Sequence, residues 1–394
     1  MKEIAAKAAP TAPAFLKNAL EGVRRLAPYE PGMPIEELQR RLGVADAVKL
    51  ASNENPLGIS PKVRAALEGA MAGHLERYPD GSGFRLKRKL AELHQIEPER
   101  ITLGNGSNDI LEFIARVFLG PGRASMFSKH AFAVYPIATQ AQGAEAVIVP
   151  ALPANSTQPY GHDLAAFAQA LRKDVSVIFI ANPNNPTGTW LDPALREKYL
   201  AYVPPQVIVV LDEAYWHYQD PATRPDVRAW LDRFPNLVVA RTFSKIYGMA
   251  SLRVGYALSH VSVADLMNRV RQPFNNNSLA LLAGEVALGD EDFVRRSVEL
   301  NCTQRARLER ELKVLGLTVL PSQANFLAVG FGRDAAPIHQ GLLERGVIVR
   351  PMKSYELPQF LRVTVGTEAE NTRFLASLKE VLAGAASAAT SVKP

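Results

Sequence analysis

The segment RTFSKIYGMASLRVGY (residues 241–256) places Lys245 directly after two hydroxyl residues, Thr242 and Ser244, and places Arg253 eight positions later. The run before it, PNLVVA, is apolar and rich in β-branched residues, which predicts a strand that ends just before Thr242. Lys245 is therefore expected in the loop that follows a strand. A lysine there is either an ordinary surface residue or a nucleophile that reacts with a carbonyl group. The rest of the sequence has to distinguish the two.

Polar residues also gather at the ends of other expected strands. They are Gly106-Ser107-Asn108, Asn184-Asn185 and Asp212-Glu213, in addition to the segment from Thr242 to Lys245. Open parallel sheets bind their ligands where the C-terminal ends of the strands meet. These strand ends are therefore expected to converge on one site.

The segment GNGSND (104–109) is a glycine-containing turn that leads into a helix, and such a turn presents free backbone N–H groups to an anion. It is not a dinucleotide-binding fingerprint, because Asp109 stands where the third glycine would be, and the sequence has no Walker loop. Together with the hydroxyls of Thr242 and Ser244 and the guanidinium of Arg253, this turn predicts a phosphate-binding cup.

Asp212 follows the run VIVV, and a carboxylate at the end of a buried strand is costly unless a positive group meets it. A metal ion is not predicted, because the seven histidines are scattered and only His217 lies near Asp212. Pyridoxal phosphate meets every requirement: a lysine forms a Schiff base with it, the cup binds its phosphate, and a carboxylate faces its pyridinium nitrogen. Asp212 would keep that nitrogen protonated. Lys245, its pKa lowered by burial beside Arg253, would act as the general base at the substrate's α-carbon.

The composition is typical of a globular protein, with 47% hydrophobic and 21% charged residues in a chain of 394. The single cysteine, Cys302, excludes an internal disulfide framework and a multi-cysteine metal site. The net charge is +6, but the basic residues are scattered, so nucleic acid is not a predicted partner. No apolar run approaches the ~18 residues of a membrane span, and the segment MKEIAAKAAPTAPAFLK lacks a continuous apolar core. We therefore expect a cytoplasmic protein that acts on small molecules.

From about residue 100 onward, strand-like runs alternate with amphipathic segments. The expected strands are RITLGNGS, ASMFS, AEAVIVP, SVIFIANP, QVIVVLDEAY, LVVARTFSK and RVGYALS, with helices such as NDILEFIARVFL and DLAAFAQALRK between some of them. This alternation predicts an α/β fold in which a three-layer α/β/α large domain contains a mainly parallel mixed sheet. After about residue 270, a long charged helix (roughly 283–315) precedes the segments LTVLPSQANFLAVGF, GVIVRPM and FLRVTVGT, which predicts a smaller α+β domain.

These patterns divide the chain into four expected parts. An N-terminal arm (1–45) is partly mobile and packs with the small domain, and a large cofactor-binding domain covers 46–270. The small C-terminal domain covers 271–385. A low-complexity tail (386–394) is expected to be disordered.

Several motifs resemble those of a known family. ANPNNPTG (181–188), LDEAYWHY (211–218), TFSKIYGMASLRVGY (242–256) and LRVTVGT (361–367) resemble the class I/II aminotransferases of pyridoxal-phosphate fold type I. SNENPLG (52–58), RYPDGSG (77–83) and GNGSNDILEFIARVF (104–118) are similar to motifs of the histidinol-phosphate aminotransferases. The resemblance runs from about residue 25 to residue 375, with the motifs in the family's order.

The resemblance implies a role for each residue of the phosphate cup. Ser107 and Asn108 would offer backbone donors to the cofactor phosphate. Thr242, Ser244 and Arg253 would complete the cup.

It also implies contacts to the cofactor ring. Phe132, in HAFAVY, falls where the family stacks an aromatic side chain on the pyridine. Asn185 and Tyr215 would form hydrogen bonds to the phenolic oxygen, and Asp212 would meet the ring nitrogen.

Finally, the resemblance implies a second subunit and a substrate site. Tyr78 would reach the cofactor phosphate of the neighbouring subunit, so a homodimer with shared active sites is expected. Arg362 would bind the acidic group of the substrate in a bidentate fork, and Arg350 would be a second anion contact. Asn53 and Asn55 would line the site near the cleft between the domains.

The activity implied is a ping-pong transamination in histidine biosynthesis, with glutamate and imidazole acetol phosphate giving L-histidinol phosphate. An aromatic amino-acid or prephenate aminotransferase carries nearly the same motifs, and a threonine-phosphate decarboxylase breaks a different bond at the same carbon. A cofactor-binding regulator would carry a DNA-binding domain, and the ~50 residues before SNENPLG contain no helix-turn-helix pattern. A catalytically inactive binding protein would be expected to lack Lys245 or Asp212, and both are present.

Overall fold

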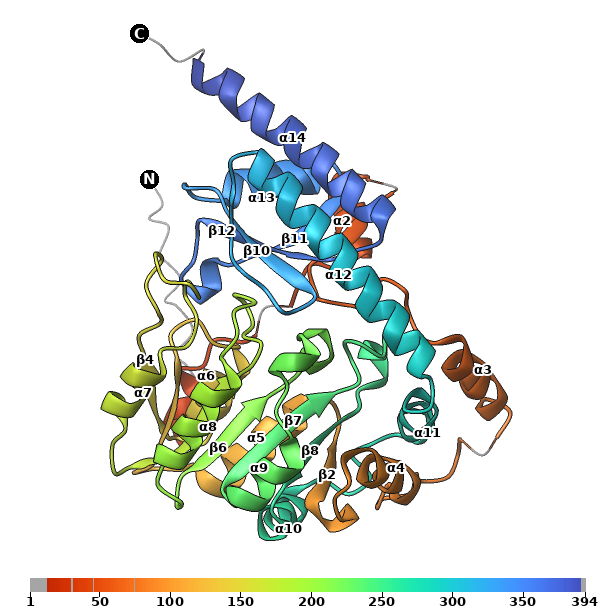
Figure 1. Ribbon diagram of the computed structural model, residues 1–394, viewed down its shortest axis with the longest axis vertical. Coiled ribbons are helices and arrows are strands. Elements are labelled where there is room, and N and C mark those ends of the chain that lie inside the picture. The colour runs from red at the N-terminus through yellow and green to blue at the C-terminus, as the bar shows by residue number, and fades with distance from the viewer. Residues whose placement is uncertain (1–12, 30, 45, 74, 391–394) are drawn as a thin grey trace, which may run out of the picture.

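The computed structural model describes residues 13–29, 31–44, 46–73 and 75–390, which form two β-sheets surrounded by helices (Figure 1). The first sheet has seven strands in the order β2-β8-β7-β6-β5-β3-β4. Their bounds are β2 Ile101–Gly104, β3 Ala124–Ser128, β4 Glu145–Val149, β5 Val175–Ala181, β6 Ile208–Asp212, β7 Leu237–Thr242 and β8 Gly255–Ser259. Neighbouring strands are parallel except at β8, which is antiparallel to both β2 and β7. The predicted mainly parallel mixed sheet is confirmed.

Helices cover both faces of this sheet, because successive side chains of each strand point to opposite faces. Val177 and Phe179 of β5 lie in one core with side chains of α5, α6 and α10. Ile178 and Ile180 lie in the other core with side chains of α4, α7, α8 and α9. The bounds are α4 Phe84–His94, α5 Ser107–Phe118, α6 Val134–Ala141, α7 Leu164–Ala170, α8 Pro193–Tyr202, α9 Val227–Arg233 and α10 Val261–Val270. The three-layer α/β/α architecture is therefore confirmed.

The second sheet has five strands in the order β1-β11-β12-β10-β9. Their bounds are β1 Val48–Leu50, β9 Thr318–Val319, β10 Phe326–Gly330, β11 Val347–Pro351 and β12 Phe360–Thr364. Side chains of α12 (Glu291–Val314), α13 (Ala336–Glu344) and α14 (Glu368–Thr390) share a core with this sheet. Figure 1 shows these helices on the side of the second sheet, with the first sheet below it. The smaller α+β unit predicted for the C-terminal part is confirmed.

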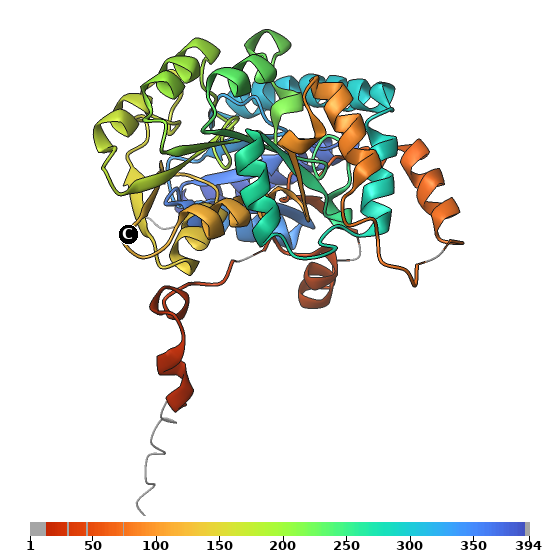
Figure 2. The ribbon, with the colours of Figure 1, turned by 90° about the horizontal axis from the view of Figure 1, so that it is seen from below.

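The N-terminal segments divide between the two sheets. Strand β1, which was not predicted, pairs in parallel with β11 although its residues belong to the range assigned to the large domain. Leu38 of α2 (Ile35–Leu42) packs with the second sheet, against Ile348 and its neighbours. The short helix α1 (Glu21–Arg24) instead lies on α6, where Gln140 Nε2 donates to the Gly22 carbonyl at 2.9 Å. Figure 2 shows the first described residues, in red, running away from the body. The domain boundaries stay a prediction.

The single helix predicted over 283–315 is wrong, because two helices occupy this region. Helix α11 (Ser278–Ala287) packs against α3 (Pro61–Ala70), and α12 starts at Glu291. The break falls at Gly289 and Asp290, and glycine is a poor helix former. The Asp290 carboxylate accepts a hydrogen bond from Ser60 Oγ at 2.5 Å and pairs with Lys62 Nζ at 3.0 Å, so contacts to α3 hold the break in place.

The predicted disordered tail also differs from the structure. Helix α14 continues through the alanine-rich segment as far as Thr390. Alanine has the highest intrinsic helix propensity, so the low-complexity composition here extends a helix that has already begun. Residues 391–394 lie outside the described residues.

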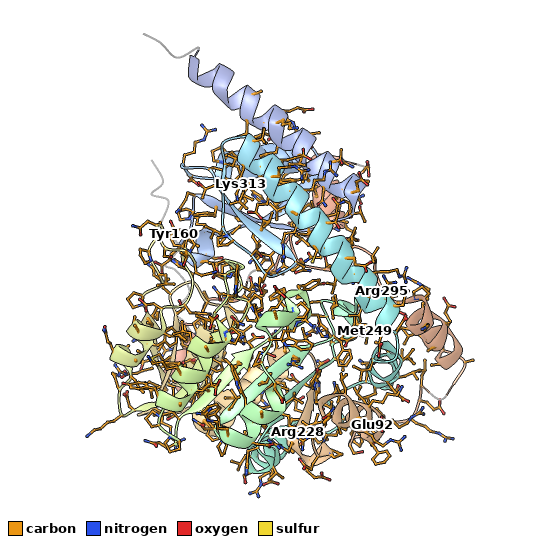
Figure 3. The ribbon with its side chains drawn as sticks, viewed as in Figure 1. Glu92, Tyr160, Arg228, Met249, Arg295 and Lys313 are labelled. Carbon is orange, nitrogen blue, oxygen red and sulfur yellow. The ribbon has the colours of Figure 1, made fainter. Side chains whose placement is uncertain are left out.

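The two sheets meet through side chains as well as through the chain itself. The ring of Tyr160, labelled in Figure 3, lies 5.6 Å from that of His130 and 5.5 Å from that of Phe360, at the start of β12. Short 3-10 helices complete the fold: η1 Ala14–Asn18, η2 Pro98–Arg100, η3 Trp216–Tyr218, η4 Pro221–Thr223, η5 Ala250–Leu252 and η6 Lys353–Tyr355. Of the helices described, none is long and apolar enough to span a bilayer.

Candidate active site

A cavity of about 210 Å³ lies where the C-terminal ends of β5, β6 and β7 face β11 and β12 of the second sheet. Most of the predicted site residues line it: Ser107, Asn108, Phe132, Asn185, Asp212, Tyr215, Thr242, Ser244, Lys245, Arg253, Arg350 and Arg362. The convergence of polar strand ends expected from the sequence is therefore found in the structure. Two predicted residues, Tyr78 and Asn55, do not line the cavity.

The loop that carries Lys245 packs tightly on the loop formed by residues 51–58. Gly248 has φ +67°, and a Cβ atom there would lie 1.8 Å from the Gly58 carbonyl oxygen, so only glycine fits. Asn55 Nδ2 donates to the Ile246 carbonyl at 2.7 Å. The amide of Asn55 thus holds the backbone next to Lys245, and Asn55 is not among the residues that line the cavity. Its role in substrate binding stays a prediction.

The Lys245 side chain is half-buried, and its amine lies among positive charges. Its Nζ donates to the Ser52 carbonyl at 3.0 Å. Burial lowers the pKa of Lys245 to about 8, assisted by Arg362 and Arg253 and opposed by the carboxylates of Glu54 and Asp212. A substantial fraction of the amine is therefore neutral, and hence nucleophilic, near physiological pH.

Asp212 ends β6 as a buried carboxylate with a specific partner. Tyr135 Oη donates to Asp212 Oδ2 at 2.9 Å, and the Ala214 amide donates to Oδ1 at 3.3 Å. Burial raises the pKa of Asp212 to about 6, and the hydrogen bond from Tyr135 opposes that rise. The side chain is thus ionised at neutral pH, although burial alone would favour the neutral acid.

Glu213, the next residue, points away from the cavity. Its Oε2 accepts hydrogen bonds from Arg241 Nε at 3.0 Å and Nη2 at 2.8 Å, and both side chains are buried. The alternation of side chains along an extended segment explains why only the first of the two acidic residues reaches the site.

Tyr215 and Asn185 each have a partner that fixes their orientation. Tyr215 Oη accepts a hydrogen bond from Asn53 Nδ2 at 2.8 Å, and burial raises the pKa of Tyr215 to about 12. Asn185 Oδ1 accepts a hydrogen bond from Arg362 Nη1 at 2.5 Å. The phenol of Tyr215 stays protonated, so its hydroxyl can act as a donor.

The predicted anion cup forms at the start of α5. The helix begins at Ser107, and its N-cap, Gly106, provides no side-chain hydrogen bond, so the first N–H groups stay available. A Cβ atom on Gly106 would lie 2.2 Å from Arg253 Nη2, which makes the close approach of Arg253 to this turn possible only with glycine. Arg253 Nη1 donates to Ser244 Oγ at 3.3 Å, and Thr242 Oγ1 donates to Ser244 Oγ at 3.0 Å. Hydroxyls, amides and a guanidinium thus converge on one place.

The opposite wall of the cavity carries two arginines on neighbouring strands. Arg350 of β11 and Arg362 of β12 are directly paired in the antiparallel register. Arg362 is 6% exposed and its Nη2 donates to the Ala51 carbonyl at 2.7 Å, while its Nε is buried without a described partner. Arg350 lies under the ring of Tyr29, with 6.0 Å between Cζ and the ring centroid. This wall is suited to bind an anion.

Tyr78 lies outside the cavity of its own chain. Its side chain is 82% exposed and its ring stacks on that of Phe274 at 4.6 Å. The single chain therefore does not bring Tyr78 to the other predicted cofactor residues, and its expected contact with a neighbouring subunit stays a prediction.

Tyr135, Tyr29 and the Ser52 carbonyl were not predicted from the sequence, and Asn53 was predicted without a specific partner. Tyr135 follows Phe132 by three residues, at the start of α6, and its ring contacts that of Phe132, with 5.9 Å between centroids. Tyr29 and Ser52 reach the cavity only through the packing of the N-terminal segments, and no local pattern indicates it. Among the residues that the structure describes, no group of His, Cys, Asp or Glu side chains is arranged to hold a metal ion.

Comparison with known proteins agrees with this geometry. Residues 45–378 match the family described as aminotransferase class I and II, and the chain belongs to that family. The histidinol-phosphate aminotransferase 2 of Pseudomonas aeruginosa is 55% identical over 94% of this chain and 99% of its own length. The histidinol-phosphate aminotransferase 1 of Dechloromonas aromatica is 54% identical over 93% and 99%. The crystal structure of histidinol-phosphate aminotransferase from Sinorhizobium meliloti in complex with pyridoxal-5'-phosphate is similar, with a TM-score of 0.84, 28% identity, and coverage of 92% of this chain and 97% of that one.

The lowered pKa of Lys245 predicts an unusual reactivity. When the ligand-free protein is labelled with acetic anhydride at increasing pH, modification of Lys245 should rise with a midpoint near pH 8. Arg362→Gln should raise that midpoint, because it removes a positive neighbour that disfavours the charged amine. Mass spectrometry of the labelled peptides measures both effects, with the exposed Lys62 as the internal control. A Lys245 midpoint equal to that of Lys62 would contradict the assignment.

The raised pKa of Asp212 predicts a cost in stability. The pKa lies at about 6 in the folded protein, against 3.8 for an unperturbed aspartate, so ionised Asp212 destabilises the fold at neutral pH. Asp212→Asn should therefore stabilise the ligand-free protein by about 1–3 kcal/mol at neutral pH, and the gain should shrink as the pH falls through 6. Denaturant unfolding measures the gain. The surface variant Asp265→Asn should change stability by less than about 0.5 kcal/mol. Equal effects of the two substitutions would contradict the prediction.

Proposed function

We propose that this protein is a pyridoxal-phosphate-dependent aminotransferase that interconverts L-histidinol phosphate and 2-oxoglutarate with imidazole acetol phosphate and L-glutamate. The observation that carries the proposal is the half-buried amine of Lys245, of lowered pKa, which lines one cavity with the residues of the anion cup and the carboxylate of Asp212. The names of the relatives at 55% and 54% identity support the choice of substrate.

The residues present fit the polar groups of the cofactor. The first amides of α5, Ser244 and Arg253 supply donors for a phosphate. Asp212 would face the pyridine nitrogen, where an ionised carboxylate favours the protonated ring. Phe132 would supply an apolar face to that ring, and Lys245 would take the aldehyde carbon.

Asn185 and Tyr215 would bind the phenolic oxygen of the cofactor. Asn185 Oδ1 is engaged by Arg362, so its Nδ2 donor is the end left to face the cavity. Two donors on one anionic oxygen stabilise its charge.

When bound, pyridoxal phosphate withdraws electrons from the bonds at the substrate's α-carbon. Lys245 Nζ, set free by the amine of the substrate, would take the proton from that carbon. A pKa of about 8 suits an amine that must accept and release a proton near neutral pH. Asp212 would hold the proton on the ring nitrogen throughout.

The paired arginines account for the acidic groups of both substrates. Histidinol phosphate carries a phosphate and no carboxylate, whereas glutamate carries two carboxylates. Arg362 would offer its unpartnered Nε to such a group, with Arg350 opposite it on β11. Arginine suits phosphate and carboxylate equally well because its fork of donors matches both.

The proposal includes a homodimer in the cytoplasm. Tyr78 is exposed, and so are the apolar side chains of Met71, Leu75 and Phe84 at and near the segment that joins α3 to α4, and of Phe274, whose ring stacks on that of Tyr78. A monomer rarely exposes so many large apolar side chains together. A second copy would cover them, and Tyr78 would reach the partner's phosphate cup. The single cysteine, which is exposed and free, is compatible with a reducing compartment.

The substrate is tested by following a single half-reaction. L-histidinol phosphate should discharge the visible absorbance of the cofactor-loaded protein with a much higher second-order rate than L-phenylalanine does. Lys245→Ala should remove both the visible band of the lysine-bound cofactor and the reaction. An equal or faster reaction with phenylalanine would reassign the enzyme to aromatic amino acids. No spectral change with either amine, or with glutamate, would refute transamination.

Shared active sites are tested by mixing two impaired variants. Tyr78→Ala and Lys245→Ala should each lose activity alone, and refolding them together should restore part of it. In a mixed dimer one site carries both substitutions and the other carries neither. Two copies of the same variant refolded alone are the control. No recovery from a mixture that forms dimers by light scattering would contradict the sharing of sites through Tyr78.

A further inference from the structure

Asn53 occupies an unusual position between the two halves of the site. It lies in the loop between β1 and α3, it is 1% exposed, and its φ of +56° is in the left-handed region that asparagine tolerates better than most residues. Its backbone carbonyl accepts a hydrogen bond from Asn325 Nδ2 at 3.0 Å. Its side chain reaches Tyr215, which follows β6 of the first sheet, and Thr364 in β12 of the second sheet.

The hydrogen bonds of Thr364 fix the orientation of the Asn53 amide. The Asn53 N–H donates to Thr364 Oγ1 at 3.0 Å, so the hydroxyl proton of Thr364 remains to be donated elsewhere. Asn53 Oδ1 lies 3.1 Å from that hydroxyl and accepts its proton. The other end of the amide is then Nδ2, which can only donate.

This orientation determines how Tyr215 can bond. Nδ2 of Asn53 lies 2.8 Å from Tyr215 Oη, so the tyrosine oxygen is the acceptor of that bond. A phenol has one proton, and Tyr215 donates it to no other residue that the structure describes. Tyr215 lines the cavity and its ring is held against Phe326, with 5.2 Å between centroids. The hydroxyl proton is therefore left to point into the cavity.

We propose that Asn53 is a positioning residue that sets the Tyr215 hydroxyl as a hydrogen-bond donor toward an anionic oxygen in the cavity. The inference rests on the proposed function, in which that oxygen is the phenolic oxygen of pyridoxal phosphate. Asn185 is set in the same way, because Arg362 occupies its Oδ1 and leaves Nδ2 as the free end. Two donors are thus oriented by neighbours before any ligand binds.

Two variants of Asn53 separate this role from a structural one. Asn53→Gly keeps the left-handed backbone and removes both side-chain bonds. Asn53→Asp keeps the acceptor for Thr364 but presents an acceptor to Tyr215, which would capture the hydroxyl proton and turn it away from the cavity. If Asn53 only holds the loop, Asn53→Asp should be the milder change. If it orients Tyr215, Asn53→Asp should lower kcat more than Asn53→Gly does.

The measurement is the pH midpoint of the visible absorbance of the loaded enzyme, together with its affinity for pyridoxal phosphate and kcat. A hydrogen bond donated to the cofactor's anionic oxygen lowers the proton affinity of the nitrogen that joins Lys245 to the cofactor. Asn53→Gly and Tyr215→Phe should therefore each raise the midpoint by about one pH unit. In the Tyr215→Phe background, Asn53→Gly should add no further shift, and Asn53→Asp should shift the midpoint by less than it does beside Tyr215. Asn325→Ala, which loosens the same loop through its backbone, should leave the midpoint unchanged.

The outcomes are distinct. An unchanged midpoint in Asn53→Gly, or shifts that add in the double variant, would overturn the inference while leaving the proposed function intact. If the unaltered protein takes up no pyridoxal phosphate, the proposed function fails and this inference fails with it. Circular dichroism verifies that each variant folds. If Asn53→Gly does not, the comparison of Asn53→Asp in the two Tyr215 backgrounds decides the question.

Discussion

The site depends on the register in which β5, β6 and β7 end. Asp212 pairs with Ala181 of β5 on one side and with Ala240 of β7 on the other. Small neighbours leave room for the carboxylate, and Thr242 then follows two residues beyond Ala240 on the same face. A slip of one residue in β6 would turn Asp212 into the core and bring Glu213 to the cavity. The hydrogen-bonded ion pair between Glu213 and Arg241 of β7 opposes that slip, because the slip would separate the two side chains and leave two buried charges without partners.

The charges that line the cavity do not balance without a ligand. Arg253, Arg350, Arg362 and Lys245 face it, and among the lining residues Asp212 is the acid that opposes them. Burial is the main cause of the lowered pKa of Lys245, and the positive charges of Arg362 and Arg253 lower it further. An anion in the cup and another at the arginine wall would relieve this repulsion. The positive charges that help to activate Lys245 therefore also favour a ligand with two anionic groups, one in the cup and one at the arginine wall.

Much of this architecture could be predicted from the sequence, because the relevant signals are local. The runs that form β5, β6 and β7 are continuous and apolar, and the polar residues of the site stand directly after them. Contacts distant in sequence left no such signal. Strand β1 is only three residues long, and the break before α12 depends on Ser60 and Lys62 of another helix. The amide of Asn55 was expected in the cavity, yet it turns to the Ile246 carbonyl, and only the packing of two loops determines that choice.

The cavity exists only while the two sheets are docked, since each supplies part of its wall. Arg362 on β12 donates to Asn185 after β5, and Asn53 joins Thr364 of β12 to Tyr215 after β6. Both connections run from the second sheet to the first, and each ends on a residue that would hold the cofactor, Asn185 or Tyr215. A substrate bound to Arg362 and reacting at Lys245 would bridge the same boundary. Ligand binding and the relative placement of the sheets are therefore thermodynamically linked: a ligand that contacts both sheets favours the docked arrangement, and docking strengthens ligand binding by the same coupling free energy.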